Sequence, residues 1–257
     1  MKTTLSLAAA AFIILFASCK KETSIDQSTG GGTTASLKVK SYTESLTSSS
    51  GNLTATFNLT YDANNRIVSA VSAPTPDFKF LYGYPSSNKI TMDLIDAGAL
   101  SIHEDYFLNS NSLIDSTFQY NDTQDTLTEK YFYNAAKQQI RTIQYDYSKL
   151  SGSVLFNTID YTYNTSGNLI QSVDSDNDVD DYEYYADLIY ISPVITGLPN
   201  PDAGQKRNLV KKHTLTSSGT VVGSAAYTYT FDAQNRISTE TQTITDGRVI
   251  VKTYTYF

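Results

Sequence analysis

The chain has 257 residues, a formal net charge of −7 and a pI near 4.8. This length suits one domain or one repeat array with enough chain to bury a core. The acidic balance excludes nucleic acid as the partner, because phosphates are bound by basic surfaces.

The chain begins with an export signal. Lys2 supplies a positive start, residues 5–16 form an apolar run, and Ala17-Ser18 precede the only cysteine, Cys19. The run is too short to span a bilayer as a helix and suits a signal peptide. Small residues before the cysteine predict a bacterial lipobox, with residues 1–18 removed and Cys19 attached to a lipid membrane through acyl chains. The alternative is ordinary secretory cleavage that leaves Cys19 free.

Residues 19–36 predict a lipidated, flexible tether, because they are rich in Ser, Thr and Gly and include Gly30-Gly31-Gly32. Lys20 follows the cysteine where an inner-membrane retention signal would place Asp. By analogy this favours the outer membrane, at the cell surface or on the periplasmic face. Residues 37–257 are then a single β-repeat domain.

A short phrase recurs along that domain: aromatic, any residue, aromatic, Asp or Asn, a small polar turn, then Ile or Leu. In the first copy, Leu59 and Tyr61 point to one face of a strand. Asp62 can start a turn by bonding to the backbone, Asn65 tolerates a left-handed conformation, and Ile67 opens the return strand. The other copies lie at residues 82–90, 106–114, 131–140, 161–169, 213–221 and 229–237.

These copies predict an all-β fold of successive antiparallel hairpins. Most recur at intervals of about 25 residues, enough for two strands and two connections. Because repeats bury their faces against neighbours in sequence, we expect a large, twisted, curved meander sheet that forms an open superhelix. A two-layer sandwich is the alternative. The sheet edges near residues 37–45 and 248–257 would need protection, which Lys38 and Lys40 could give to the first.

The repeated unit resembles the tyrosine–aspartate (YD, RHS-like) repeat of bacterial cell-surface proteins. Together with the lipoprotein leader, it is similar to a family of Bacteroidetes-type lipoproteins whose domain has no known function. The resemblance covers residues 40–257 and implies an extended antiparallel sheet. It supplies no catalytic residues.

Two features are candidate binding sites. Alternating carboxylates could surround a calcium ion, which prefers oxygen ligands, or could form a solvated acidic hairpin tip; they are Asp174, Asp176, Asp178 and Asp180. The first aromatics of the repeats could form an exposed row that stacks on a ligand, or could pack against each other across strands; they are Tyr82, Tyr106, Tyr131, Tyr161 and Tyr229. Apart from calcium, no cofactor is expected.

Three further features have weaker implications. The Pro- and Gly-rich stretch 193–204 interrupts the repeats and is either a binding loop or a plain crossing. Basic residues beside it, Lys206-Arg207 and Lys211-Lys212, could attract an anion or merely offset the acidic surface. Ser116 and Thr126 each follow an Asp and are candidate O-glycosylation sites.

Catalysis has little support. The two histidines, His103 and His213, lie in unrelated repeats, and no nucleophile-elbow or phosphate-loop motif occurs. We therefore expect a binding or adhesion module of the envelope, for polysaccharide, peptide or another envelope protein. A structural or assembly accessory of the periplasm is the alternative, and an uncharacterised hydrolase is a third reading.

Overall fold

A computed structural model describes residues 38–121, 126–148, 152–190, 193–198 and 207–257. The predicted signal peptide, Cys19 and the tether lie outside these ranges. No helix in the described ranges has the length and apolar character needed to cross a membrane.

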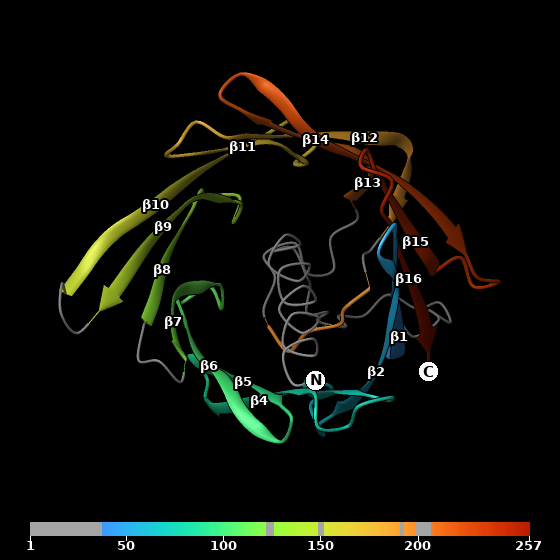
Figure 1. Cartoon of the computed structure of the whole chain (residues 1–257). Helices are drawn as coiled ribbons and strands as arrows, with labels where there is room; N and C mark the ends of the chain where they lie inside the picture. Colours follow the sequence, from blue (N-terminus) through green and yellow to red (C-terminus); the bar gives the residue numbers. More distant parts are fainter. Residues whose placement is uncertain (1–37, 122–125, 149–151, 191–192, 199–206) are drawn as a thin grey trace.

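The chain forms a closed antiparallel barrel, seen from one end in Figure 1. The strands are β1 (Val39–Ser48), β2 (Gly51–Tyr61), β3 (Ile67–Ser72), β4 (Lys79–Ser86), β5 (Lys89–Asp96), β6 (Ala99–Leu108), β7 (Ile114–Asn121), β8 (Thr126–Tyr133), β9 (Gln139–Ser148), β10 (Gly152–Tyr163), β11 (Leu169–Asp174), β12 (Val179–Tyr190), β13 (Arg207–Ser217), β14 (Thr220–Phe231), β15 (Ile237–Ile244) and β16 (Val249–Tyr256).

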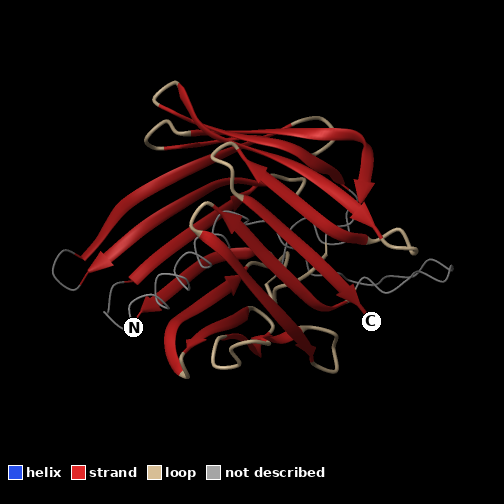
Figure 2. Ribbon diagram, turned by 45° about the vertical axis from the view of Figure 1, so that its right-hand side comes forward, coloured by secondary structure: helices blue, strands red, loops and turns tan. Residues whose placement is uncertain are grey.

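The predicted open superhelix is wrong, and so is the alternative sandwich, because β1 pairs with β16. Tyr42 lies opposite Tyr254 and Glu44 opposite Lys252 in this closing pair. Figure 2 shows the strands running obliquely around the barrel, and such tilt lets the last strand return beside the first. The expected edge protection is also wrong, since the two end strands satisfy each other's backbone groups. The all-β content predicted from the repeats is confirmed.

Five of the seven copies of the recurring phrase fold into one type of turn, and the copies at residues 82–90 and 213–221 form two-residue hairpins instead. Asp62 Oδ1 accepts hydrogen bonds from the amides of Asn64 and Arg66, both at 2.9 Å. The Asp62 amide donates to the Arg66 carbonyl, and Asn65 has a φ of 62°. The same pattern recurs in the turns that begin at Asn109, Asn134, Asn164, Asp174 and Asp232.

The two ends of the barrel carry different sets of turns. Strand direction alternates, so every turn after an even-numbered strand lies at one end, which we call the repeat end. β1 starts there at Val39, directly after Lys38. The opposite, or far, end carries the β1–β2, β11–β12 and β15–β16 turns, including the acidic turn at Asp174.

Residues 193–198 fill part of the barrel interior. Ile195 is fully buried, and Val194 forms a parallel bridge with Lys38. Gly197 packs so closely that a Cβ there would lie 2.5 Å from Cγ of Tyr82. Around this plug, inward-facing side chains form the apolar core: Val39, Tyr42, Phe57, Leu59, Ile67, Ala70, Tyr82, Leu209, Ile237 and Tyr254.

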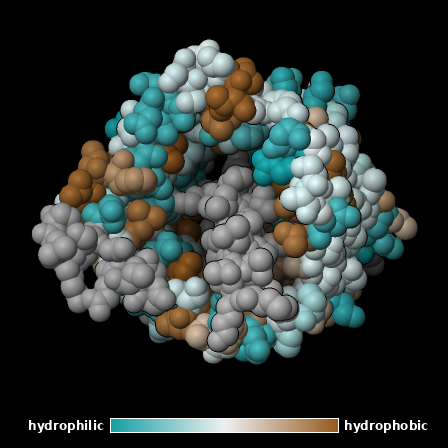
Figure 3. Space-filling model, in the orientation of Figure 1, coloured by the Kyte–Doolittle hydropathy of each residue, from teal (hydrophilic) through white to brown (hydrophobic). Residues whose placement is uncertain are grey.

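The outer face of β1–β3 and of β14–β15 carries pairs of polar side chains. On β1 and β2, Tyr42 and Phe57 point inward, so their neighbours Thr43 and Thr56 point outward, where their hydroxyls lie 2.8 Å apart. Similar outward pairs join Ser45 to Thr54, Thr60 to Ser69 and Thr230 to Ser238. In Figure 3 the right-hand wall is coloured mostly white to teal, with few brown atoms.

The outer face of β6–β10 is more apolar. Phe107, Tyr120, Phe132, Leu155 and Phe156 are exposed there, and Phe156 keeps 67% of its surface in water. Brown atoms over β10 appear at the left of Figure 3. Even so, the region carries an ion pair between Arg141 Nε and Asp160 Oδ1 at 2.5 Å.

Candidate functional site

Tyrosines at the repeat end join neighbouring strands. The hydroxyl of Tyr84, at the end of β4, donates to the carbonyl of Ile67, the first residue of β3, at 2.7 Å. We call each such contact a tyrosine seam. Others join Tyr61 to Val39, Tyr133 to Ile114, Tyr163 to Gln139, Tyr184 to Leu169, Tyr229 to Val210 and Tyr256 to Ile237. They fix the rim on which the repeat turns sit.

At the seams of Tyr84, Tyr256 and Tyr61, a cation lies over the tyrosine ring. The guanidinium of Arg66 lies 3.9 Å from the Tyr84 centroid, and that of Arg236 lies 4.2 Å from Tyr256. Lys38 Nζ lies 4.1 Å from the Tyr61 centroid. In each case the cation directly precedes the residue whose carbonyl accepts the tyrosine hydroxyl. Burial raises the pKa of Tyr84 to about 12, and it also raises the pKa of Tyr61 and Tyr256.

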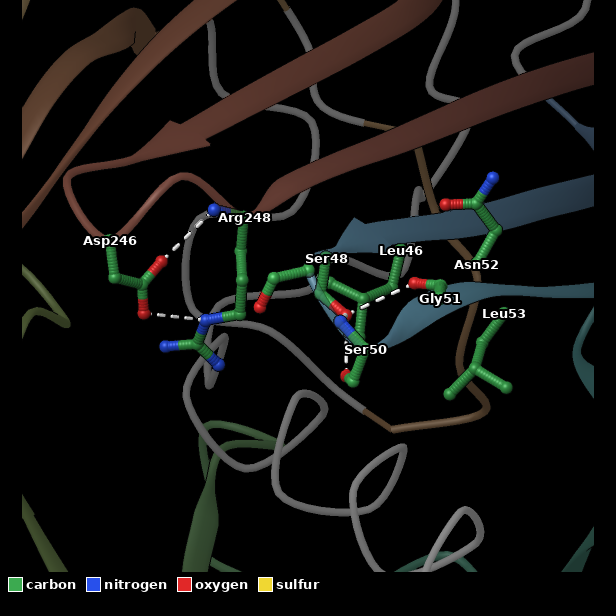
Figure 4. Close-up of a pocket in the computed structure, with 9 residues that line it drawn as sticks. Leu46, Ser48, Ser50, Gly51, Asn52, Leu53, Asp246 and Arg248 are labelled. Atoms are coloured by element: carbon green, nitrogen blue, oxygen red, sulfur yellow. Dashed lines mark hydrogen bonds and ion pairs between the residues drawn. The ribbon is translucent and has the colours of Figure 1, made fainter.

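A hollow of about 520 Å³ lies at the far end, between the β1–β2 and β15–β16 turns. Figure 4 shows Ser48 and Ser50 beside Asp246 and Arg248, whereas the Asn52 amide points away from that ion pair. Arg248 Nε is held by Asp246 Oδ2 at 2.7 Å. Hydroxyls, an amide and an ion pair beside Leu46 and Leu53 could bind a polar ligand such as a glycan or a peptide backbone.

The tyrosines proposed as a stacking row point into the barrel. Tyr82 and Tyr106 are buried, and Tyr131, Tyr161 and Tyr229 are partly buried. Tyr106 donates to Glu104 at 2.5 Å, and Tyr131 donates to Glu129. Burial first, and then the neighbouring glutamate, raises the pKa of both hydroxyls well above its usual range.

A charged row crosses the other side of the interior. Glu44 and Lys252 are 2% and 8% exposed, and Glu240 is paired with Lys252 in the sheet register. Burial raises the pKa of Glu44, while Lys252 lowers it and Glu240 raises it further. Our sequence interpretation missed these residues. The alternation along the strand could have indicated their burial, because Glu44 lies two residues from both Tyr42 and Leu46, which face inward.

The four candidate calcium ligands are divided between two places. Asp174 Oδ1 accepts the amides of Asp176 and Asp178 within the far-end turn. Asp180 points into the barrel, where its Oδ1 lies 2.6 Å from His213 Nε2. No group of three potential ligands close enough for a metal occurs in the described ranges. The calcium site stays a prediction, to be tested by the melting temperature with calcium and with chelator.

The other candidates lie on separate strands. Ser116 is partly buried, and Thr126 keeps only 7% of its surface, so its hydroxyl is poorly accessible in the folded barrel. In the Pro- and Gly-rich stretch, residues 193–198 form the plug, and residues 199–206 lie outside the described ranges. In the basic cluster, Lys212 Nζ approaches Glu183 at 3.7 Å.

Both histidines contact carboxylates. His103 Nδ1 lies 2.5 Å from Asp93 Oδ1, and its Nε2 lies 3.3 Å from Asp105. His213 stacks on Tyr182, with centroids 4.9 Å apart, beside Asp180. His103 lies on the outer face of the wall, whereas His213 lies inside the barrel. The structure does not bring the two histidines together.

No protein-family model matches the chain. No curated protein matches it either. Among solved structures, a porin-like protein from Bacteroides uniformis aligns with a TM-score of 0.59 at 12% identity, over 85% of this chain and 96% of that chain. A porin-like protein from Bacteroides vulgatus aligns with a TM-score of 0.48 at 12% identity, over 86% and 99%. The first likeness shows that this chain shares the fold of a porin-like barrel.

Proposed function

We propose that the protein is an outer-membrane lipoprotein whose barrel stands in water beside the bilayer and serves as a binding module. The observation that supports this most is the orientation of the wall. Membrane-spanning barrels present an apolar outer band and a polar interior. Here the outer face of β1 and β2 carries hydroxyl pairs, such as Thr43 with Thr56, and the apolar core and plug lie inside.

The position of the first barrel strand favours an orientation. Lys38 enters the barrel at the repeat end, so a lipid on Cys19 would hold that end nearer the membrane. The far-end hollow of about 520 Å³ would then face away. We propose this hollow, with Arg248 in its lining, as the place where a polysaccharide or peptide is bound.

A screen of glycan arrays and peptide libraries with the purified protein tests the proposal. We expect at least one ligand class to bind, and Arg248→Ala to weaken that binding roughly tenfold, because a charge-assisted contact is lost. Ser217→Ala, in the β13–β14 hairpin, is the control. Protease accessibility on intact cells reports the direction of display. Absence of binding across both panels would contradict the binding function.

One observation favours a second function, an assembly accessory of the periplasm. The exposed apolar side chains of Phe107, Tyr120, Phe132, Leu155 and Phe156 give β6–β10 a wall suited to partner contact. Cross-linking in cells through that wall would support this function. The proposal includes no catalytic step and no cofactor.

A further inference from the structure

The seam between Tyr133 and Ile114 differs from the three seams that hold a cation. Its hydroxyl contact is present, at 2.8 Å. The residue before the acceptor, however, is Leu113, where the seams of Tyr61, Tyr84 and Tyr256 have lysine or arginine. In two of these turns an aspartate binds the guanidinium through an Nε–Oδ2 contact of 2.7 Å, Asp62 with Arg66 and Asp232 with Arg236. The corresponding residue here is Asn109. Both the aspartate and the arginine of that ion pair are therefore replaced by uncharged residues in this turn.

A hollow of about 350 Å³ opens at this seam, and we call it the Leu113 hollow. Its lining includes Asn109, Leu113, Asp115, Tyr133 and Asn134. Lys137 is the one cation in that lining. Over the parts of the chain that the structure describes, no lysine or arginine is placed above the Tyr133 ring, in contrast to the rings of Tyr61, Tyr84 and Tyr256.

The electrostatics of the hollow favour a positive group. Asp115 is exposed and lines the same space. Tyr133 and Asp115 line the same hollow, and burial first and then the Asp115 charge raise the pKa of Tyr133. An aromatic face and a carboxylate both attract cations, and arginine satisfies both through its planar, multiply donating guanidinium.

We propose that the Leu113 hollow binds the guanidinium or ammonium group of a basic peptide side chain, placed by Tyr133 and Asp115. The bound group would bring to Tyr133 the positive charge that Arg66 brings to Tyr84, but from the hollow, because Leu113 fills the position equivalent to Arg66. This inference rests on the proposed function as a binding module and names a ligand class and a second site for it, at the repeat end.

The test is an NMR titration of the full-length protein in detergent micelles with acetyl-arginine-amide, and with acetyl-citrulline-amide as its uncharged counterpart. We expect a dissociation constant on the order of millimolar for arginine, since only one side chain is presented. Citrulline should bind at least roughly tenfold more weakly. Asp115→Asn should weaken arginine binding about fivefold, whereas the charge-matched control Asp187→Asn should leave it unchanged.

A blocking variant copies the seams in which a cation already lies over the tyrosine ring. Asn109→Asp with Leu113→Arg should place a guanidinium over Tyr133 and abolish the titration, with an unchanged melting temperature. If this variant does not fold, the comparison of Asp115→Asn with Asp187→Asn decides. Equal binding of arginine and citrulline, no effect of Asp115→Asn, or binding of a methyl glycoside in this hollow would overturn the inference. If array ligands bind at Arg248 while arginine does not bind here, the inference fails and the proposed function stands. If nothing binds at either place, the function itself fails.

Discussion

The guanidinium carbon of Arg66 lies 3.9 Å from the centre of the Tyr84 ring. The single hydroxyl hydrogen of the same tyrosine is shared between the carbonyl of Ile67, the residue that follows Arg66, and the carbonyl of Gly197 in the plug, at 3.0 Å. One side chain thus joins the repeat turn, the neighbouring strand and the plug. The stability of the barrel should depend on this contact.

Tyr84→Phe removes the hydroxyl and leaves two partly buried carbonyls without that donor. We expect the free energy of unfolding to fall by about 1–2 kcal/mol, as for a lost buried hydrogen bond. Urea unfolding followed by circular dichroism measures this. Tyr120→Phe on the exposed outer wall is the matched control and should change stability by less than about 0.5 kcal/mol. Equal effects of the two substitutions would contradict the role of the seam.

The seams also predict a loss of stability at high pH. Burial raises the pKa of Tyr84 from 10.0 to about 12, and the pKa of Tyr61, Tyr133 and Tyr256 moves in the same direction. The folded state therefore retains protons that the unfolded state loses. This contribution is fully present below pH 10 and is lost as the pH rises through the folded-state pKa values. Urea midpoints should be flat from pH 8 to 9 and fall above pH 10; a flat profile to pH 12 would contradict this.

Gly197→Ala tests the plug. A Cβ at this position would lie 2.5 Å from Tyr82 Cγ and 2.8 Å from Tyr84 Oη, so the plug or both rings must move. Overpacking of this kind costs about 1–3 kcal/mol. Gly223→Ala on β14 adds the same methyl group where no atom lies within 4 Å, and it should be neutral. If the two variants have the same melting temperature, the plug is not packed as described.

Ser112→Val tests the shared turn. Ser112 has a φ of 59°, a left-handed conformation that β-branched residues adopt at a cost of roughly 1–2 kcal/mol. Ser112→Gly removes that cost and should keep or slightly raise stability. The difference in melting temperature between the valine and glycine variants is the measurement. If valine is tolerated as well as glycine, the turn is not left-handed at this position.

The repeat phrase predicted the local structure because its information is local. Asp62 and Asn65 specify a turn through contacts made within five residues, and Leu59 and Tyr61 share a face for reasons of strand geometry. Closure is a different kind of property. Whether β16 meets β1 depends on tilt and register summed over all strands, which no single copy encodes.

The candidate sites were harder to predict for the same reason. Once the sheet closes, one face of every strand becomes interior, so Tyr82 and Tyr106 became core residues instead of a displayed row. The buried charges Glu44 and Lys252 meet across the closing pair, which the expected open sheet lacked. The Leu113 hollow is visible only by comparing seams in space. Within the sequence, its one trace is the exchange of Asp62 and Arg66 for Asn109 and Leu113.

The orientation of the wall is tested most directly by producing residues 20–257 without the lipidated cysteine and without detergent. If the outward side chains of Thr43, Thr56 and Arg141 face water, the protein should sediment as a soluble monomer with the circular dichroism of a β-barrel. A chain that folds only after detergent or lipid is added, and pellets with membranes despite lacking Cys19, would show that the wall is embedded in the bilayer.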